Sequence, residues 1–153
     1  CLSTSTSVGI IVAFICSLAA AQTDRYEAHF ETEIRPVLVA KCIGCHGESK
    51  QEGGLRLDSL ADMLRGGESG STIERGNVDG SLLLEAIRYE SYEMPPSGQL
   101  SDETIRQFEK WIAAGAAWPE TSKKLRSDPS AITSDDRQSC RGRSGVLPER
   151  SVV

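Results

Sequence analysis

The chain has 153 residues, which is long enough for one domain with its own hydrophobic core. Its formal net charge is −5, and only 5% of its residues are aromatic. The acidic charge lies in residues 22–136, with 13 Lys+Arg against 21 Asp+Glu, whereas residues 137–153 are basic, with 4 against 1. An acidic body argues against nucleic acid and anionic membrane surfaces as partners. It favours a basic protein partner, or simple solubility.

An apolar segment runs from Val8 to Ala21 and ends in small residues. Its length is typical of the core of a secretory signal peptide and is short for a helix that spans a bilayer. The sequence therefore predicts a signal peptide over residues 1–21, with cleavage after Ala21. No Met, Lys or Arg precedes the apolar run, so we expect this signal to be incomplete at its start. We interpret Cys16 as an ordinary apolar residue of the signal.

Residues 24 to about 40 show helical periodicity, with apolar residues spaced to form one stripe. The stripe consists of Phe30, Ile34, Val37 and Leu38. Pro36 lacks a backbone N–H, so we expect a kink or a fresh helical start near Arg35. This helix leads the chain directly into Cys42.

The run Cys42-Ile43-Gly44-Cys45-His46 follows this helix. Two thiols at this spacing can each add to a vinyl group of one haem, and the histidine that follows can bind the iron as its proximal ligand. A thioredoxin-like dithiol would need a βαβ context, and a zinc site usually needs four ligands. The remaining cysteines and histidine stand alone: Cys1, Cys16, Cys140 and His29. We therefore predict that Cys42 and Cys45 tether a haem and that His46 binds its iron.

Residues 47–80 are rich in glycine and show little periodicity. Within them, Asp58 or Ser59 can cap a short helix over residues 60–65, which Gly66 would end. Glycines allow a backbone to approach a flat ligand closely, and tight turns without any ligand contact explain them equally well.

Two further helices are predicted after this segment. Ser81 is the expected N-cap of a helix over residues 82–89. Ser101 is the expected N-cap of the last helix, which ends near Gly115. Two carboxylates in the first turn of the last helix oppose its dipole favourably. The inward positions are Leu83, Leu84 and Ile87 in the first of these helices and Ile105, Phe108, Trp111 and Ile112 in the second. No segment shows sustained strand alternation, so the fold is predicted to be all-α.

Residues 120–153 are polar and carry few large apolar side chains, so we expect a disordered tail there. The predicted organisation is therefore a signal peptide over residues 1–21, a haem domain over residues 22–119 and this tail.

A low-spin electron carrier needs a second iron ligand, and the candidates are Met63, His29 and Met94. Met63 lies on the apolar face of a short predicted helix, where core packing is the simpler role. His29 precedes the motif by too few residues to reach the opposite haem face easily. Met94 follows His46 by 48 residues, in a loop that two prolines keep out of helix and that can close over the far face. We predict Met94 as the distal ligand, following the His/Met ligation of cytochromes c.

Six short motifs follow one another along the chain: Ile34-Arg35-Pro36-Val37-Leu38, Cys42-Ile43-Gly44-Cys45-His46-Gly47, Gly54-Leu55-Arg56-Leu57-Asp58, Gly66-Gly67, Met94-Pro95-Pro96 and Trp111-Ile112-Ala113-Ala114-Gly115-Ala116. In this order they resemble planctomycete-type cytochrome c domains, over about residues 30–119. The resemblance implies a compact, all-α cytochrome c fold around one haem, with His46 and Met94 as ligands.

These observations predict a small exported c-type cytochrome that binds one haem c covalently and transfers single electrons. We expect an electron carrier rather than an enzyme, since the sequence contains no nucleophile elbow and no phosphate loop. A buried porphyrin would supply the planar apolar mass that few aromatic residues provide. The expected location is the periplasm or cell-envelope space, with redox proteins as partners and membrane association only through an uncleaved signal segment.

Two alternatives stay open. The first is a haem peroxidase or sensor, in which the sixth iron position is free. The second is an accessory domain of a truncated larger protein that does not itself carry electrons.

Overall fold

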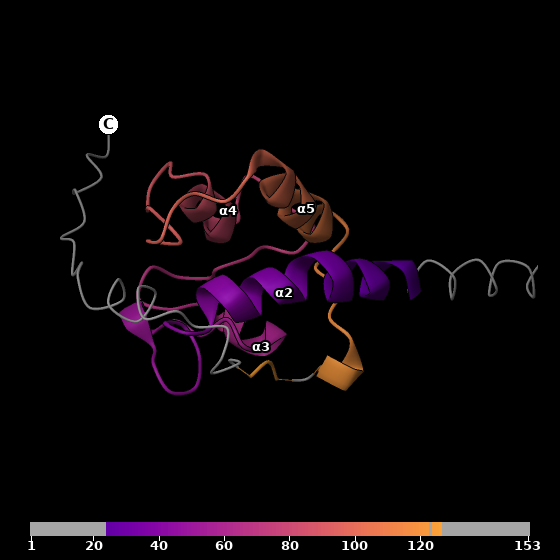
Figure 1. Cartoon of the computed structure of the whole chain (residues 1–153), viewed down its shortest axis with the longest axis horizontal. Coiled ribbons are helices and arrows are strands. Elements are labelled where there is room, and N and C mark those ends of the chain that lie inside the picture. The colour runs from indigo at the N-terminus through magenta and orange to yellow at the C-terminus, as the bar shows by residue number, and fades with distance from the viewer. Residues whose placement is uncertain (1–23, 123, 127–153) are drawn as a thin grey trace, which may run out of the picture.

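The computed structural model describes residues 24–122 and 124–126 (Figure 1). Within these ranges the regular elements are helices, and β-pairing is limited to three isolated bridges in turns. The all-α prediction is confirmed for this part of the chain. None of the described helices is long and apolar enough to cross a membrane. The predicted signal peptide, residues 1–21, lies outside the described residues.

One long helix runs through residues 24–42 and crosses the centre of the molecule (Figure 1). It is α-helical over residues 24–29, π-helical over η1 (Phe30–Ile34), α-helical over α2 (Arg35–Val37) and π-helical over η2 (Leu38–Cys42). Pro36 accounts for the change at Arg35, because a proline without an N–H is accommodated best in the first turn of an α-helix. Ile34 and Arg35 keep right-handed helical dihedrals, so the structure shows a change of hydrogen-bond pattern within one continuous helix rather than a fresh start.

The apolar stripe of this helix supplies one side of the core. Its fully buried members are Phe30, Ile34 and Leu38. Val37, which the periodicity placed in the same stripe, is half-buried at the edge of the core. The ring of Phe30 lies 5.9 Å from that of Trp111 and 4.4 Å from that of Trp118, centroid to centroid. These aromatic contacts fasten the long helix to the last one.

The last helix, α5 (Asp102–Ala113), begins as predicted. The Ser101 hydroxyl accepts a hydrogen bond from the Thr104 N–H at 3.2 Å, which satisfies one of the free donors of the first turn. The four predicted inward residues are all buried: Ile105, Phe108, Trp111 and Ile112. In Figure 1, α4 and α5 lie on one side of the long helix, and α3 lies on the other.

Helix α3 (Leu60–Arg65) also has the predicted bounds. Of the two proposed caps, Ser59 fills the role, because its hydroxyl accepts from the Asp62 N–H at 3.2 Å. Gly66 ends the helix with a φ of 72°, a conformation that glycine adopts without steric cost.

Helix α4 (Leu82–Ile87) differs from its prediction in two ways. It ends at Ile87 rather than Tyr89, because Tyr89 has a φ of 64° and turns the chain away. The Ser81 side chain does not cap the helix. Its fully buried hydroxyl instead accepts from the Glu74 N–H at 3.0 Å and donates to the Asn77 carbonyl at 2.7 Å. The turn over residues 74–77, just before the helix, thus binds the hydroxyl that the sequence pattern assigned to the cap.

Residues 117–122 and 124–126, here called the C-terminal strap, return to the domain. They contain η4 (Glu120–Ser122), and Leu125 is 4% exposed within the core. The Leu125 N–H donates to the Asp58 carbonyl at 2.7 Å. Ser122 and Leu125 are therefore buried, although sequence composition placed residues 120–153 in a polar tail. The rest of that predicted tail, residues 127–153, lies outside the described residues.

Candidate functional site

The chain makes a tight turn at the C-terminal end of the long helix and brings both motif cysteines and the histidine together. The Cys42 carbonyl accepts from the N–H groups of Cys45 at 3.1 Å and of His46 at 3.0 Å. Cys42 closes the last π turn, in which the Ile43 N–H donates to the Leu38 carbonyl. The covalent anchors and the first ligand predicted from sequence therefore share one rigid turn.

The two cysteines differ in chemical state. Cys42 is a free, half-buried thiol, and burial raises its pKa to about 12, although nearby Lys41 opposes the rise. Burial therefore disfavours the thiolate of Cys42, which is the form in which a redox-active dithiol reacts. Cys45 is disulfide-bonded in this structure. A sulfur atom cannot hold a disulfide and a thioether at once, so attachment of a haem requires Cys45 in its reduced form.

The His46 imidazole is held in one orientation. Its Nδ1 lies 3.1 Å from the Glu52 carbonyl oxygen. A carbonyl can only accept, so Nδ1 carries the proton and Nε2 keeps its lone pair. Burial lowers the pKa of His46, against the opposing influence of the Glu52 and Leu55 backbones. A neutral imidazole with an oriented Nε2 is the form that binds a transition metal.

Close-packed glycine turns support the segment that holds His46. The Glu68 N–H donates to the Gly53 carbonyl at 2.9 Å, next to the Glu52 carbonyl that His46 bonds. A Cβ atom added at Gly67 would press on Gly53 and Leu55, and one added at Gly66 would collide with Gly70. Both glycines therefore allow close backbone approach between turns. This finding assigns them to packing of the loop, one of the two roles left open by the sequence.

Met94 lies in the loop between α4 and α5 and is half-buried. Its N–H donates to the Ala86 carbonyl at 3.2 Å, and its peptide bond to Pro95 is cis. The Tyr92 hydroxyl, two residues earlier, lies 3.1 Å from the Ser69 hydroxyl. Ser69 directly follows Glu68, which bonds the turn behind His46. A short series of contacts therefore connects the loop of Met94 with the loop of His46.

The other two candidate ligands have structural roles. Met63 is fully buried in the hydrophobic core, as its place on α3 predicted. The His29 Nε2 lies 3.1 Å from the Gln107 carbonyl, which ties the long helix to α5. Because this nitrogen donates to a backbone oxygen, His29 is committed to helix packing.

The described residues contain no group of three or more His, Cys, Asp or Glu side chains that could hold a metal ion. A zinc site built from protein ligands therefore has no support in this part of the chain. A haem makes a smaller demand, because the porphyrin supplies four nitrogen ligands and the protein only the axial ones. The oriented His46 imidazole can supply one of these axial ligands, and the free Cys42 thiol can supply a covalent attachment.

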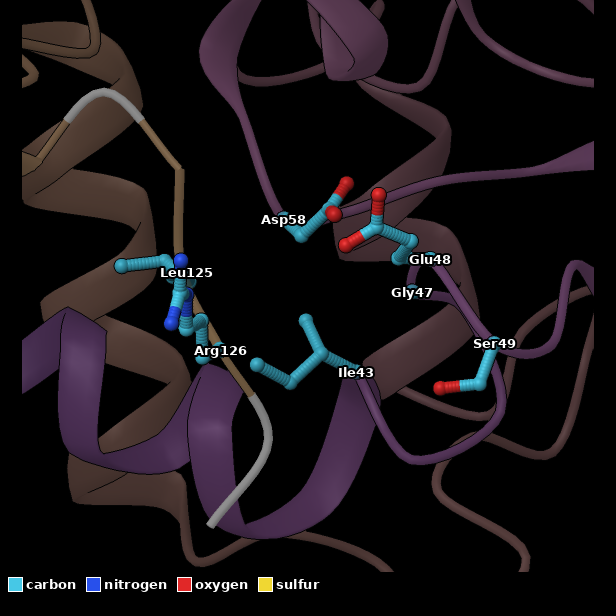
Figure 2. A pocket seen from close by; sticks show the side chains of 7 residues that line it. All are labelled: Ile43, Gly47, Glu48, Ser49, Asp58, Leu125 and Arg126. Carbon is cyan, nitrogen blue, oxygen red and sulfur yellow. The ribbon is translucent and has the colours of Figure 1, made fainter.

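Sequence reasoning missed an ion pair and a cleft behind the motif turn. The Asp58 carboxylate is 1% exposed and binds the Arg56 guanidinium through two contacts, at 3.0 and 2.6 Å. Figure 2 shows Asp58 and Glu48 on one wall of a cleft of about 290 Å³, facing Arg126 and Ile43. The residues that line it are Ile43, Gly47, Glu48, Ser49, Asp58, Leu125 and Arg126. The lining includes Ile43 and Gly47 of the motif turn but neither His46 nor Met94.

In the sequence, Arg56 and Asp58 stand out only as members of the motif Gly54-Leu55-Arg56-Leu57-Asp58. A charged residue two positions before a carboxylate carries no signal of burial by itself. The C-terminal strap reaches this segment from far along the chain, where the Leu125 N–H donates to the Asp58 carbonyl.

Residues 42–98 match the family model described as planctomycete cytochrome C. The match begins at the first motif cysteine and ends four residues after Met94, so it contains all four predicted site residues. The predicted resemblance is confirmed for this segment. No curated protein and no solved structure matches the chain.

Proposed function

We propose that this chain is an exported c-type cytochrome that holds one haem covalently and passes single electrons. In this proposal Cys42 and Cys45 form the two thioether bonds, His46 binds the iron on one face, and Met94 binds it on the other. The match of residues 42–98 to planctomycete cytochrome C supports the class of cofactor. The cysteine spacing and the directly following histidine support its covalent attachment.

The hydrogen bond from His46 Nδ1 to the Glu52 carbonyl is the observation that carries the proposal. It selects the tautomer whose Nε2 carries the lone pair that can bind a metal, and it makes the imidazole a stronger donor. The bond forms beside two cysteines at the spacing that haem attachment uses. Zinc or redox-dithiol chemistry would not need this combination of residues.

A bound haem would supply the one-electron couple, and the residues of this chain would set its properties. His46 and Met94 together would leave no open position for oxygen or substrate. A thioether ligand favours the reduced iron relative to a second imidazole, so Met94 would raise the reduction potential. The glycine turns would keep the His46 loop close to the core and limit access of water.

We further propose that the protein acts in the periplasm or cell-envelope space, with a redox protein of basic surface as its partner. The apolar run over residues 8–21 supports export, and c-type haem is attached outside the cytoplasm. The acidic charge of residues 22–136 supports electrostatic steering of a positively charged partner.

The test is an absorption and magnetic circular dichroism spectrum of protein expressed with haem-maturation machinery. We expect low-spin haem with a sulfur-to-iron charge-transfer band in the oxidised state. High-spin haem that binds carbon monoxide or cyanide readily would instead indicate the peroxidase or sensor alternative.

Two sets of variants separate the residue roles. Cys42→Ala and Cys45→Ala should each leave a singly attached haem, and the double variant should retain none on a haem-stained denaturing gel. His46→Gln should lose the low-spin spectrum. His29→Gln is the matched control, since it removes only a helix-packing hydrogen bond and should keep that spectrum. Covalent haem in the double cysteine variant would refute the assignment.

A further inference from the structure

Tyr89 has an unusual backbone conformation at the C-terminal end of α4. Its φ is 64°, in the left-handed region that bulky residues rarely adopt. The Tyr89 N–H donates to the Ala86 carbonyl at 3.2 Å, and the Glu90 N–H donates to the Glu85 carbonyl at 2.9 Å. These two bonds form a Schellman motif, in which the left-handed position is usually glycine. A tyrosine therefore stands where its backbone is strained.

The Tyr89 side chain provides a reason for this strain. Its hydroxyl donates to the Pro95 carbonyl at 2.7 Å, and the ring is half-buried. The bond closes the loop over residues 90–94 by joining its two ends. The left-handed turn at Tyr89 redirects the chain so that the ring and the returning loop meet.

Met94 is the last residue of the loop that this hydrogen bond closes. Its N–H donates to the Ala86 carbonyl, which also accepts from the Tyr89 N–H. The residue is thus tied to the end of α4 through its own backbone and through its neighbour Pro95. Loss of the Tyr89 hydroxyl would leave only the first of these restraints.

We propose that Tyr89 is a positioning residue for Met94, holding the methionine where its sulfur can reach the far side of the haem. This inference rests on the proposed function, because it needs Met94 as the distal ligand. Tyr89 acts through the Pro95 carbonyl and does not itself touch the iron. A strained backbone at this point is the kind of local exception that functional sites maintain.

The test uses the Tyr89→Phe variant of the haem-loaded protein, with Tyr26→Phe as its matched control. Tyr89→Phe keeps the ring and the backbone strain and removes only the hydroxyl, whereas Tyr26 is exposed on the long helix. The readouts are the sulfur-to-iron band, the reduction potential and the apparent binding constant for imidazole. We expect Tyr89→Phe to bind imidazole roughly three- to tenfold more tightly, the factor that one neutral hydrogen bond represents. Its band should weaken and its potential fall, whereas Tyr26→Phe should match the wild type.

A second variant separates positioning from capping. Tyr89→Gly relaxes the left-handed backbone and removes the ring, so a residue that served only as a helix cap would lose nothing. We expect this variant to bind imidazole at least as tightly as Tyr89→Phe does. Wild-type imidazole binding and potential in both Tyr89 variants would overturn the inference.

Met94→Ala shows which proposal has failed in that case. If Met94→Ala loses the band while both Tyr89 variants keep wild-type properties, the positioning role is wrong and the ligand assignment stands. If Met94→Ala leaves the band unchanged, the ligand assignment is wrong, and the role of Tyr89 fails with it.

Discussion

Alanine substitution at the two methionines should give opposite results, because one packs the core and the other is the proposed ligand. Met63 is fully buried, so Met63→Ala removes a complete side chain from the core and leaves a cavity. The sulfur-to-iron band of the oxidised protein should nevertheless persist. Met94 is only half-buried, so Met94→Ala should abolish the band and cost less packing energy.

The expected stability change for Met63→Ala is a loss of about 2–5 kcal/mol in the free energy of unfolding. The upper half of this range applies, because the side chain has no exposed fraction and the core residues around it belong to several helices. Met63→Leu is the matched control. It conserves volume and should cost less than about 1.5 kcal/mol.

Urea unfolding of the haem-loaded proteins measures the change in the free energy of unfolding. The absorption of the oxidised proteins at the near-infrared edge measures the sulfur-to-iron band. Loss of the band in Met63→Ala together with its retention in Met94→Ala would show that the wrong methionine was assigned. An unfolding free energy unchanged in Met63→Ala would refute the packing argument for α3.

Two further predictions concern acid stability and the C-terminal strap. The Ser59 hydroxyl, followed by nearby arginines, lowers the pKa of Asp62 in the folded state. The stabilisation that ionised Asp62 gives the fold is therefore complete above its unfolded pKa and is lost as the pH falls through its lower folded pKa. Asp62→Asn should therefore make the free energy of unfolding decline less steeply with acid, as measured by unfolding curves at a series of pH values. Leu125→Ala should reduce stability by about 2–5 kcal/mol in urea, since a buried leucine is truncated. Unchanged acid sensitivity in the first variant, or wild-type stability in the second, would contradict these expectations.

Local sequence was sufficient for most helix boundaries. The caps at Ser59 and Ser101 and the stop at Gly66 depend on hydrogen bonds or φ values within three or four residues, so the information is contained in a short window. The motif around Cys42 is equally local, because covalent attachment and ligation by the next histidine need only a fixed spacing. Met94 as the distal ligand remains a prediction from sequence, which the shared contacts of its loop support.

Tertiary structure decided the features that helical periodicity and cap patterns do not contain. The Ser81 hydroxyl bonds the 74–77 turn instead of its own helix. Leu125 is buried and its N–H bonds the Asp58 carbonyl far back in the chain, a contact that the polar composition of residues 120–153 does not reveal. Tyr89 is the clearest case, since a helical pattern continues through it while its hydroxyl bond to Pro95 accompanies a left-handed turn. Periodicity records which residues can share a helix face, but the energy of a contact between distant segments appears only once the chain has folded.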